Sequence, residues 1–193
     1  MDKLSRNELM SLEEYAGKRD EIRAQAMAHK KPRRVAIGPH LALCFEDRIT
    51  MQYQVQEMLR IEKIFEADAI QEELDTYNPL IPDGSNWKAT AMLEYQDVEE
   101  RKIELAKLTG IEHLVWVQVD GFGPVPAISN EDLERSTEEK TSAVHFMRFE
   151  LDSKMISALK ERANLSMGVD HRHYHHQVQV SDATKTSLLA DLD

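Results

Sequence analysis

The chain has 193 residues, enough for one domain of ordinary size with a hydrophobic core of its own. Its 35 acidic side chains outnumber its 24 lysines and arginines, so the formal net charge at pH 7 is −11. A negative field repels phosphate backbones, and we therefore expect no binding to nucleic acid. The sequence shows neither the apolar run of a secretory signal at its start nor the ~18 consecutive apolar residues of a spanning helix. We expect a cytoplasmic protein that does not bind membranes.

Cys44 is the single cysteine, so the chain forms no internal disulfide and cannot supply the roughly four thiolates of an iron–sulfur cluster. In the stretch LALCF this cysteine alternates with Leu41, Leu43 and Phe45. The pattern is typical of a strand, and we expect Cys44 to be an inert packing residue in it.

The first 34 residues predict a helical arm that ends in a basic linker. Apolar residues recur at helical spacing among charged ones over residues 5–28. The run HKKPRR follows at residues 29–34. This run either binds an acidic partner or a phosphate, or lies in solvent between the helix and the first strand. We expect the remaining residues, 35–193, to form the core domain.

The core domain is predicted to begin with one or two strands and a long helix. Residues 35–45 indicate either a strand pair or one bent strand, interrupted at Gly38, Pro39 and His40. Residues 46–75 contain neither glycine nor proline, which predicts one uninterrupted helix ending before Pro79.

The later elements alternate between short strands and helices. The predicted order is a strand at 88–95, a helix at 97–109, a hairpin at 115–126, a charged helical connector at 130–140, a strand at 142–151, a helix at 152–162, a histidine-rich segment and a final helix at 182–192. Several strands follow one another with no helix between them. We therefore expect a mixed or antiparallel sheet covered by helices, in a single α+β domain.

The segment GVDHRHYHHQVQV, near the carboxyl end, contains four of the eight histidines. Strand alternation places Val169 and His171 on one face upstream, and His176 and Val178 on one face downstream. These two sets have opposite parity, so the chain must reverse between them. A four-residue loop at 172–175 would pair His171 with His176 on the apolar face, with Cβ atoms about 5 Å apart.

A metal site is one interpretation of this hairpin. The segment SAVHFMRFEL would add a third imidazole, because His145 shares a face with apolar residues there. The predicted site then has three imidazole ligands and two supporting side chains: His145, His171, His176, Asp170 and Tyr174. Imidazole with carboxylate suits iron, zinc and manganese alike. The alternatives are a hydrogen-bonded or proton-handling cluster, or a polar loop in solvent.

The predicted long helix adds carboxylates to this interpretation. Glu62 fills a gap in an apolar stripe, and Glu57 lies one turn from positions that face inward. A buried carboxylate needs a cation beside it, either a metal ion or an arginine such as Arg48, Arg60 or Arg148. Either glutamate would then complete the metal site or form a structural ion pair.

Six long blocks of the chain match one known pattern: LSRNELMSLEEY, HKKPRRVAIGP, FEDRITMQYQVQEMLRIEKIF, YNPLIPDGSNWKATAM, EEKTSAVHFMRFEL and MGVDHRHYHH. Together they extend over nearly the whole chain, which resembles an uncharacterised bacterial domain-of-unknown-function family of about this length. The tail motif of that family, Asp-His-x-x-Tyr-x-His, falls on Asp170, His171, Tyr174 and His176.

Members of the family are often encoded beside rubrerythrin-like di-iron proteins and iron–sulfur electron carriers. The resemblance therefore implies a role in peroxide defence or electron transfer, with such a protein as partner. The chain itself lacks the cysteines of an iron–sulfur cluster and the paired E-x-x-H motifs of a di-iron helical bundle.

Three functions fit these patterns. The first is an accessory protein of a bacterial redox or peroxide-defence system, with a histidine-based metal site whose open position binds water or peroxide. The second is a non-catalytic adaptor for a redox partner, without a cofactor, that uses the basic run and the long helix. The third is a small-molecule binding domain or pH sensor built on the imidazoles. Whether the chain is an enzyme, and whether it forms homo-oligomers, stays open at this point.

Overall fold

The structure, a computed structural model of the chain, describes residues 2–131, 136–137 and 140–193. Within these residues lie two antiparallel sheets with helices around them, which confirms the predicted α+β class. The helices are α1 (Leu12–Lys30), α2 (Arg48–Glu62), α3 (Ala67–Tyr77), α4 (Val98–Lys107), α5 (Ser153–Lys160) and α6 (Asp182–Leu189), with 3-10 turns η1 (Arg6–Glu8), η2 (Lys31–Arg33), η3 (Asn78–Leu80) and η4 (Ile111–His113). The strands are β1 (Arg34–Ile37), β2 (Leu41–Glu46), β3 (Asn86–Leu93), β4 (Val115–Val119), β5 (Val125–Pro126), β6 (Ile128–Ser129), β7 (Val144–Glu150), β8 (Leu165–His171) and β9 (Tyr174–Gln179).

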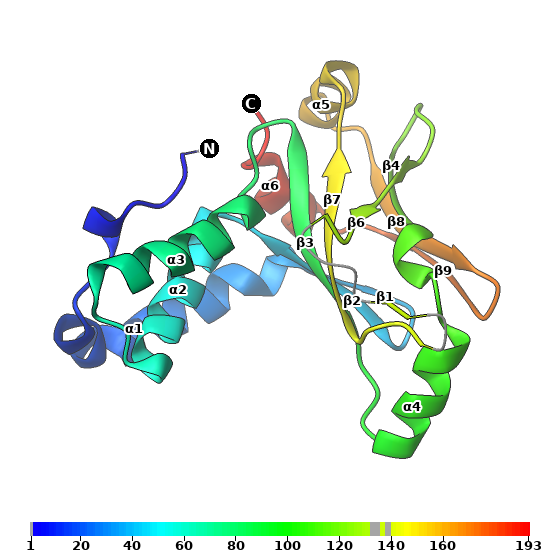
Figure 1. Cartoon of the computed structure of the whole chain (residues 1–193). Coiled ribbons are helices and arrows are strands. Elements are labelled where there is room, and N and C mark those ends of the chain that lie inside the picture. The colour runs from blue at the N-terminus through cyan, green and yellow to red at the C-terminus, as the bar shows by residue number, and fades with distance from the viewer. Residues whose placement is uncertain (1, 132–135, 138–139) are drawn as a thin grey trace.

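The two sheets enclose the main hydrophobic core. The first sheet has the order β1-β2-β3-β7-β6 and the second the order β5-β4-β8-β9. Because β1 lies beside β9, and β5 beside β7, both sheets curve around one interior (Figure 1). Strand alternation sends every second side chain into this core, where the following are fully buried: Leu43, Trp87, Val117, Phe149 and Met167.

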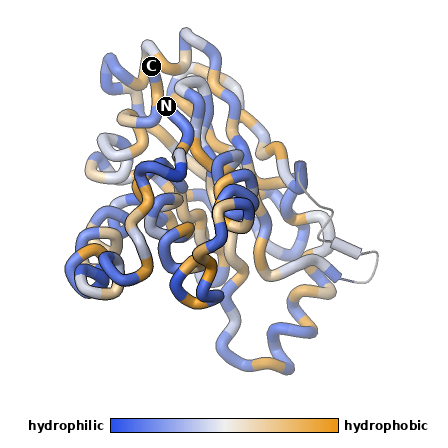
Figure 2. The backbone as a smooth tube through the Cα atoms, turned by 60° about the vertical axis from the view of Figure 1, so that its left-hand side comes forward, coloured by the Kyte–Doolittle hydropathy of each residue, from blue (hydrophilic) through white to orange (hydrophobic). Residues whose placement is uncertain are grey.

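A helical layer made of α1, α2 and α3 lies on one side of the first sheet, at the left of Figure 1. It has a second, smaller core in which Val55 and Leu59 of α2 pack with Leu74 of α3. Figure 2 shows hydrophobic and hydrophilic residues alternating along these helices, as expected for elements with one buried face. In the described part of the chain, no helix combines the length and the apolar character needed to cross a bilayer.

The predicted helix at 46–75 is two helices. Asp47 caps the start of α2 with its side chain, and α2 ends at Lys63, which has a left-handed backbone with φ +57°. The chain then reverses, so that α3 packs back on α2 and buries Leu59 and Leu74. The uninterrupted helix predicted from the lack of glycine and proline is therefore wrong, because a lysine takes the left-handed position.

The predicted helical arm is confirmed as α1, but the basic run does not form a solvated linker. Residues Lys31–Arg33 make a 3-10 turn, and Arg33 is only 1% exposed. Lys30 lies over the ring of Tyr53, 5.5 Å from its centroid. The charged connector predicted at 130–140 includes residues 132–135 and 138–139, which lie outside the described residues.

Candidate functional site

The histidine-rich segment forms the β8–β9 hairpin with a two-residue turn. Tyr174 pairs with His171, and His176 pairs with Val169. The predicted four-residue loop and the direct pairing of His171 with His176 are therefore wrong. The prediction that His171 and His176 share the inward face is right, because the observed strand register differs from the predicted one by two residues and such a shift leaves each side chain on the same face. His171 is buried and His176 is half-buried.

His171 is hydrogen-bonded within its own hairpin. Its Nδ1 accepts a hydrogen bond from the backbone N–H of His173 at 3.2 Å. Burial lowers the pKa of His171 and keeps the imidazole neutral. The backbone of Thr109 also acts on the ring and raises its pKa in part. To ligate a metal through Nδ1, this ring would have to give up the hydrogen bond from His173.

Tyr174 and His176 fasten the hairpin to the turn between β1 and β2. The Tyr174 hydroxyl accepts hydrogen bonds from the N–H groups of His40 (2.8 Å) and Leu41 (3.0 Å), and donates one to the carbonyl of Ile37 (2.8 Å). The His176 ring lies 4.6 Å from that of Tyr174, centroid to centroid. Both rings cover Gly38, where an added Cβ would lie 2.6 Å from the imidazole. Glycine at this position, with φ +71°, permits the close approach.

His145 points inward, as predicted, but into a different cluster. Its Nε2 lies 2.9 Å from the Thr141 hydroxyl and 3.1 Å from the Ser142 carbonyl, and its Nδ1 lies 3.3 Å from the Asn130 side chain. The carboxylate of Glu112 lies close by, with its Oε2 3.9 Å from His145 Nε2.

Glu112, on η4, is a buried carboxylate that the sequence patterns did not single out. It is 1% exposed and accepts hydrogen bonds from the hydroxyls of Ser136 and Thr141. Burial pushes the pKa of Glu112 up, but these hydroxyls and His145 outweigh it, and the net shift is downward. His171 also interacts electrostatically with this carboxylate. Glu112 therefore lies beside one predicted imidazole, that of His145, and hydroxyl groups donate the hydrogen bonds to its carboxylate.

The predicted carboxylates of the long helix lie in the helical layer. Glu57 is 8% exposed and faces inward, whereas Glu62 is exposed at the end of α2. Glu57 receives hydrogen bonds from Arg19 Nε and Nη2 and from the Tyr15 hydroxyl, all at 2.8 Å, and Arg60 lies 3.4 Å away. The structural ion pair with Arg60 is confirmed, and Arg19 is a stronger partner that the sequence did not indicate.

Replacing Glu57 with glutamine should lower the free energy of unfolding by about 2–4 kcal/mol at neutral pH, because it leaves half-buried arginines unpaired. The hydrogen bonds from Arg19 lower the pKa of Glu57 to about 2. Because the pKa of Glu57 is lower in the folded than in the unfolded chain, its carboxylate stabilises the fold fully at a pH above the unfolded-state pKa. This stabilisation is lost as the pH falls toward the folded-state pKa. Urea unfolding should therefore show the gap between wild type and Glu57→Gln shrinking below pH ~4.5. The exposed pair Lys18–Glu14 supplies the control Glu14→Gln, and a pH-independent gap for Glu57→Gln would contradict the ion pair.

The structure thus separates the predicted metal ligands into distinct places. Asp170 lies on the outer side of the hairpin, where it accepts a hydrogen bond from Trp116 Nε1 (2.9 Å) and lies 3.3 Å from His175. Across residues 2–131, 136–137 and 140–193, no three histidine, cysteine, aspartate or glutamate side chains are placed to hold one metal ion.

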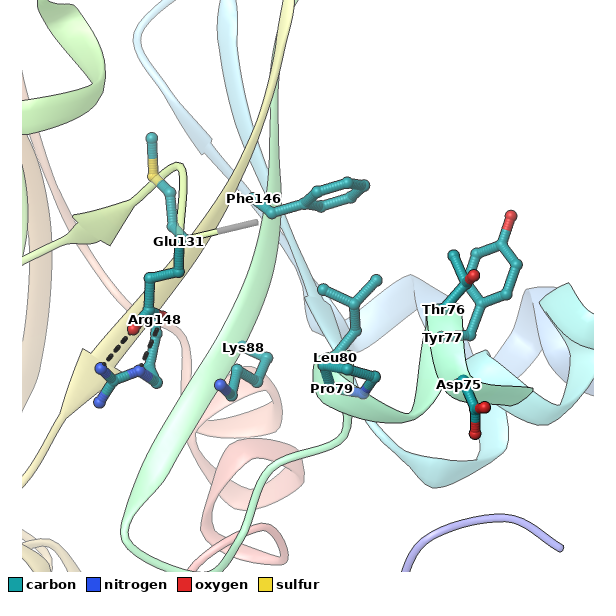
Figure 3. A pocket seen from close by; sticks show the side chains of 10 residues that line it. Asp75, Thr76, Tyr77, Pro79, Leu80, Lys88, Glu131, Phe146 and Arg148 are labelled. Atoms are coloured by element: carbon teal, nitrogen blue, oxygen red, sulfur yellow. Dashed lines mark hydrogen bonds and ion pairs between the residues drawn. The ribbon is translucent and has the colours of Figure 1, made fainter. Parts of the chain in front are cut away.

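A cavity of about 450 Å³ lies on the outer face of the first sheet, where β3 and β7 meet the end of α3 and η3 (Figure 3). Lys88 and Arg148 project from its floor, and Phe146 extends from β7 toward the wall that carries Tyr77 and Leu80. The sequence patterns did not indicate this cavity. The period-two alternation around Lys88 was the available signal, since it places a lysine on the face opposite the core.

Comparison with known proteins supports the resemblance seen in the sequence. A crystal structure of a novel protein of unknown function from Burkholderia pseudomallei K96243 has 52% sequence identity and a TM-score of 0.95, with 100% of each chain covered. No curated protein matches the chain. The family model described as "Protein of unknown function (DUF3501)" matches residues 3–192. The chain therefore belongs to the DUF3501 family.

Proposed function

We propose that this protein is a non-catalytic adaptor that binds a redox partner through its helical layer. The partner class is the one implied by the resemblance, a rubrerythrin-like di-iron protein or an iron–sulfur electron carrier. The side chains predicted as metal ligands support this choice, because they already serve the fold: His171 bonds to the backbone and Glu57 is paired with arginine. A metal-dependent accessory role would require these groups to exchange good partners for an ion.

The observation that carries the proposal is an apolar surface at the turn between α2 and α3. Phe65 is 70% exposed and Ile61 is 56% exposed. The turn between α2 and α3 lies at the end of the helical layer that is far from the sheets (Figure 1). Beside Phe65 is a cavity of about 460 Å³ whose walls include Leu9 and Ile70. Exposed aromatic and aliphatic side chains next to an apolar cavity are typical of a protein-binding surface.

Charged side chains of both signs surround this surface. Arg6 lines the cavity, and Lys63 is exposed in the same turn. Among the described residues, neither side chain forms an ion pair. Glu62, Glu66 and Asp68 are also exposed in this turn, so both signs of charge surround the apolar contact. The exposed apolar side chains, and not the local charge, therefore carry the proposal.

The proposal predicts that the variant Ile61→Ser/Phe65→Ser loses binding to the partner while keeping its fold. Isothermal titration of the full chain with a rubrerythrin-like protein and with an iron–sulfur carrier from the same organism should show at least about a tenfold loss of affinity for one of them. The matched control is Ile103→Ser on α4, where the isoleucine is 57% exposed but lies elsewhere. Equal affinity of the double variant and the control, or no complex of the wild type with either protein, would contradict the adaptor role.

A further inference from the structure

Two cations face each other on the floor of the cavity between β3 and β7. Lys88 and Arg148 are directly paired residues of the two antiparallel strands, so both side chains project from the same face. Like charges in directly opposed positions destabilise a sheet. On the other side of Lys88 its strand partner is Glu46, whose Oε1 accepts a hydrogen bond from the Thr90 hydroxyl at 2.9 Å. The carboxylate of Glu46 is thus turned toward Thr90.

Arg148 is compensated by its neighbours, whereas Lys88 is not. The guanidinium of Arg148 donates to both carboxylate oxygens of Glu131, at 2.9 and 2.7 Å, and also to Glu150. Lys88 forms no hydrogen bond or ion pair with any residue that the structure describes. Burial lowers the pKa of Lys88 and the charge of Arg148 lowers it further, while the more distant carboxylates of Glu131 and Asp83 offset this only in part. A half-buried ammonium with no anion at ion-pair distance among the described residues is a costly arrangement that a bound anion would relieve.

The rest of the cavity is largely apolar, apart from Asp75, Thr76 and Glu131. Phe146 reaches across it from β7, and Tyr77, Pro79 and Leu80 form the facing wall (Figure 3). A concave, mostly apolar site with a few convergent polar groups is the usual form of a small-molecule site. With about 450 Å³, this cavity is at the small end of the range for such sites, roughly 300–1,000 Å³.

We propose that this cavity binds a small organic monocarboxylate, with Lys88 contacting the carboxylate and with Phe146, Tyr77 and Leu80 enclosing an apolar or aromatic body. The site is separate from the apolar surface at Phe65, and it stands whether or not the adaptor role is correct.

The charge balance favours a carboxylate over a phosphate. Glu131 and Glu150 already take up the charge of Arg148, which leaves Lys88 as the cation that is unpaired within the described residues. The cavity is also lined by the carboxylates of Asp75 and Glu131, which repel a phosphate dianion about twice as strongly as a monoanion, and a phosphate would need further donors. A monocarboxylate needs one cation, and its body gains from contact with the apolar wall.

Isothermal titration of the full chain with phenylacetate tests the proposal, with phenylacetamide as the uncharged analogue and phenyl phosphate as the dianion. Phenylacetate should bind the wild type, the other two should bind more weakly, and Lys88→Gln should bind phenylacetate at least about tenfold more weakly. Lys88→Gln should keep its thermal stability, because it removes one of two opposed cations. The control is Lys102→Gln, at a lysine that is 66% exposed on α4, and it should bind as the wild type does.

Amide NMR spectra of the same titration should place the shifts at Lys88 and Phe146. Phenylacetamide binding as tightly as phenylacetate, unchanged affinity in Lys88→Gln, or no shift at these residues at millimolar phenylacetate would overturn the site. Tighter binding of phenyl phosphate than of phenylacetate would overturn the choice of a monocarboxylate.

Discussion

Replacing Arg33 with methionine is expected to lower the free energy of unfolding by about 3–5 kcal/mol, because it leaves a buried carboxylate without its cation. Arg33 Nη2 lies 2.5 Å from Asp191 Oδ2, and both side chains are 1% exposed. The guanidinium also donates to the carbonyls of Phe45 (3.1 Å), Glu46 (3.2 Å) and Ser187 (3.1 Å). This one side chain therefore joins the end of the helical arm to β2 and to α6.

Asp191 has no other partner to compensate for the loss. Its Oδ1 is buried and has no hydrogen-bond partner among the described residues. The control is Arg34→Met, because the Arg34–Glu94 pair is about half-exposed and should contribute less than about 1 kcal/mol. Urea unfolding of both variants measures the difference. Similar losses for Arg33→Met and Arg34→Met would show that the buried network contributes little.

Tyr174→Phe should cost about 2–4 kcal/mol, although it removes a single oxygen atom, because three backbone groups lose their partner. The hydroxyl accepts hydrogen bonds from the N–H groups of His40 and Leu41 and donates one to the carbonyl of Ile37. Tyr174 and Ile37 are 137 residues apart in the sequence. The phenylalanine ring would keep the packing over Gly38. The expected loss is therefore one of hydrogen bonds, and the exchange of the Leu41 amide hydrogen should accelerate.

Tyr95→Phe is the matched control for this variant. Tyr95 is also buried, at 8% exposure, but no hydrogen bond joins its hydroxyl to another described residue. Its replacement should leave the urea midpoint nearly unchanged. A Tyr174→Phe variant as stable as Tyr95→Phe, with normal protection of the Leu41 amide, would mean that the hydroxyl does not hold the hairpin.

The β8–β9 hairpin shows what the sequence could and could not predict about the candidate site. Period-two alternation correctly placed His171 and His176 on the inner face. Alternation cannot distinguish registers that differ by two residues, because every side chain keeps its face. The observed register places Tyr174 opposite His171, where its hydroxyl reaches the β1–β2 turn. That contact lies far away in sequence, and no local pattern reveals it.

The helical layer gives a similar lesson about local signals. Periodicity predicted a helix around Glu57 and predicted that this side chain points inward. The burial of the Glu57 carboxylate in turn predicted a cation beside it. The identity of Arg19 as the main partner depends on how α1 packs against α2, which periodicity does not determine. The break at Lys63 had no glycine or proline to mark it, since a lysine adopts the left-handed conformation there.

Glu112 and Lys88 were missed for different reasons. Glu112 lies in a 3-10 turn too short to have a period, so its burial was not predictable from spacing. Lys88 lies in a strand whose alternation was clear, and its place on the outer face was predictable. Its meeting with Arg148 across β3 and β7 depends on the order of strands in the sheet, which the sequence does not give.

If the imidazoles of His145, His171 and His176 serve the fold, protein purified without an affinity tag should contain no stoichiometric iron, zinc or manganese. Element analysis should then find the same metal content in the wild type and in the His171→Ala/His176→Ala variant. Near-stoichiometric metal in the wild type that is lost in this double variant would contradict this structural role of the imidazoles.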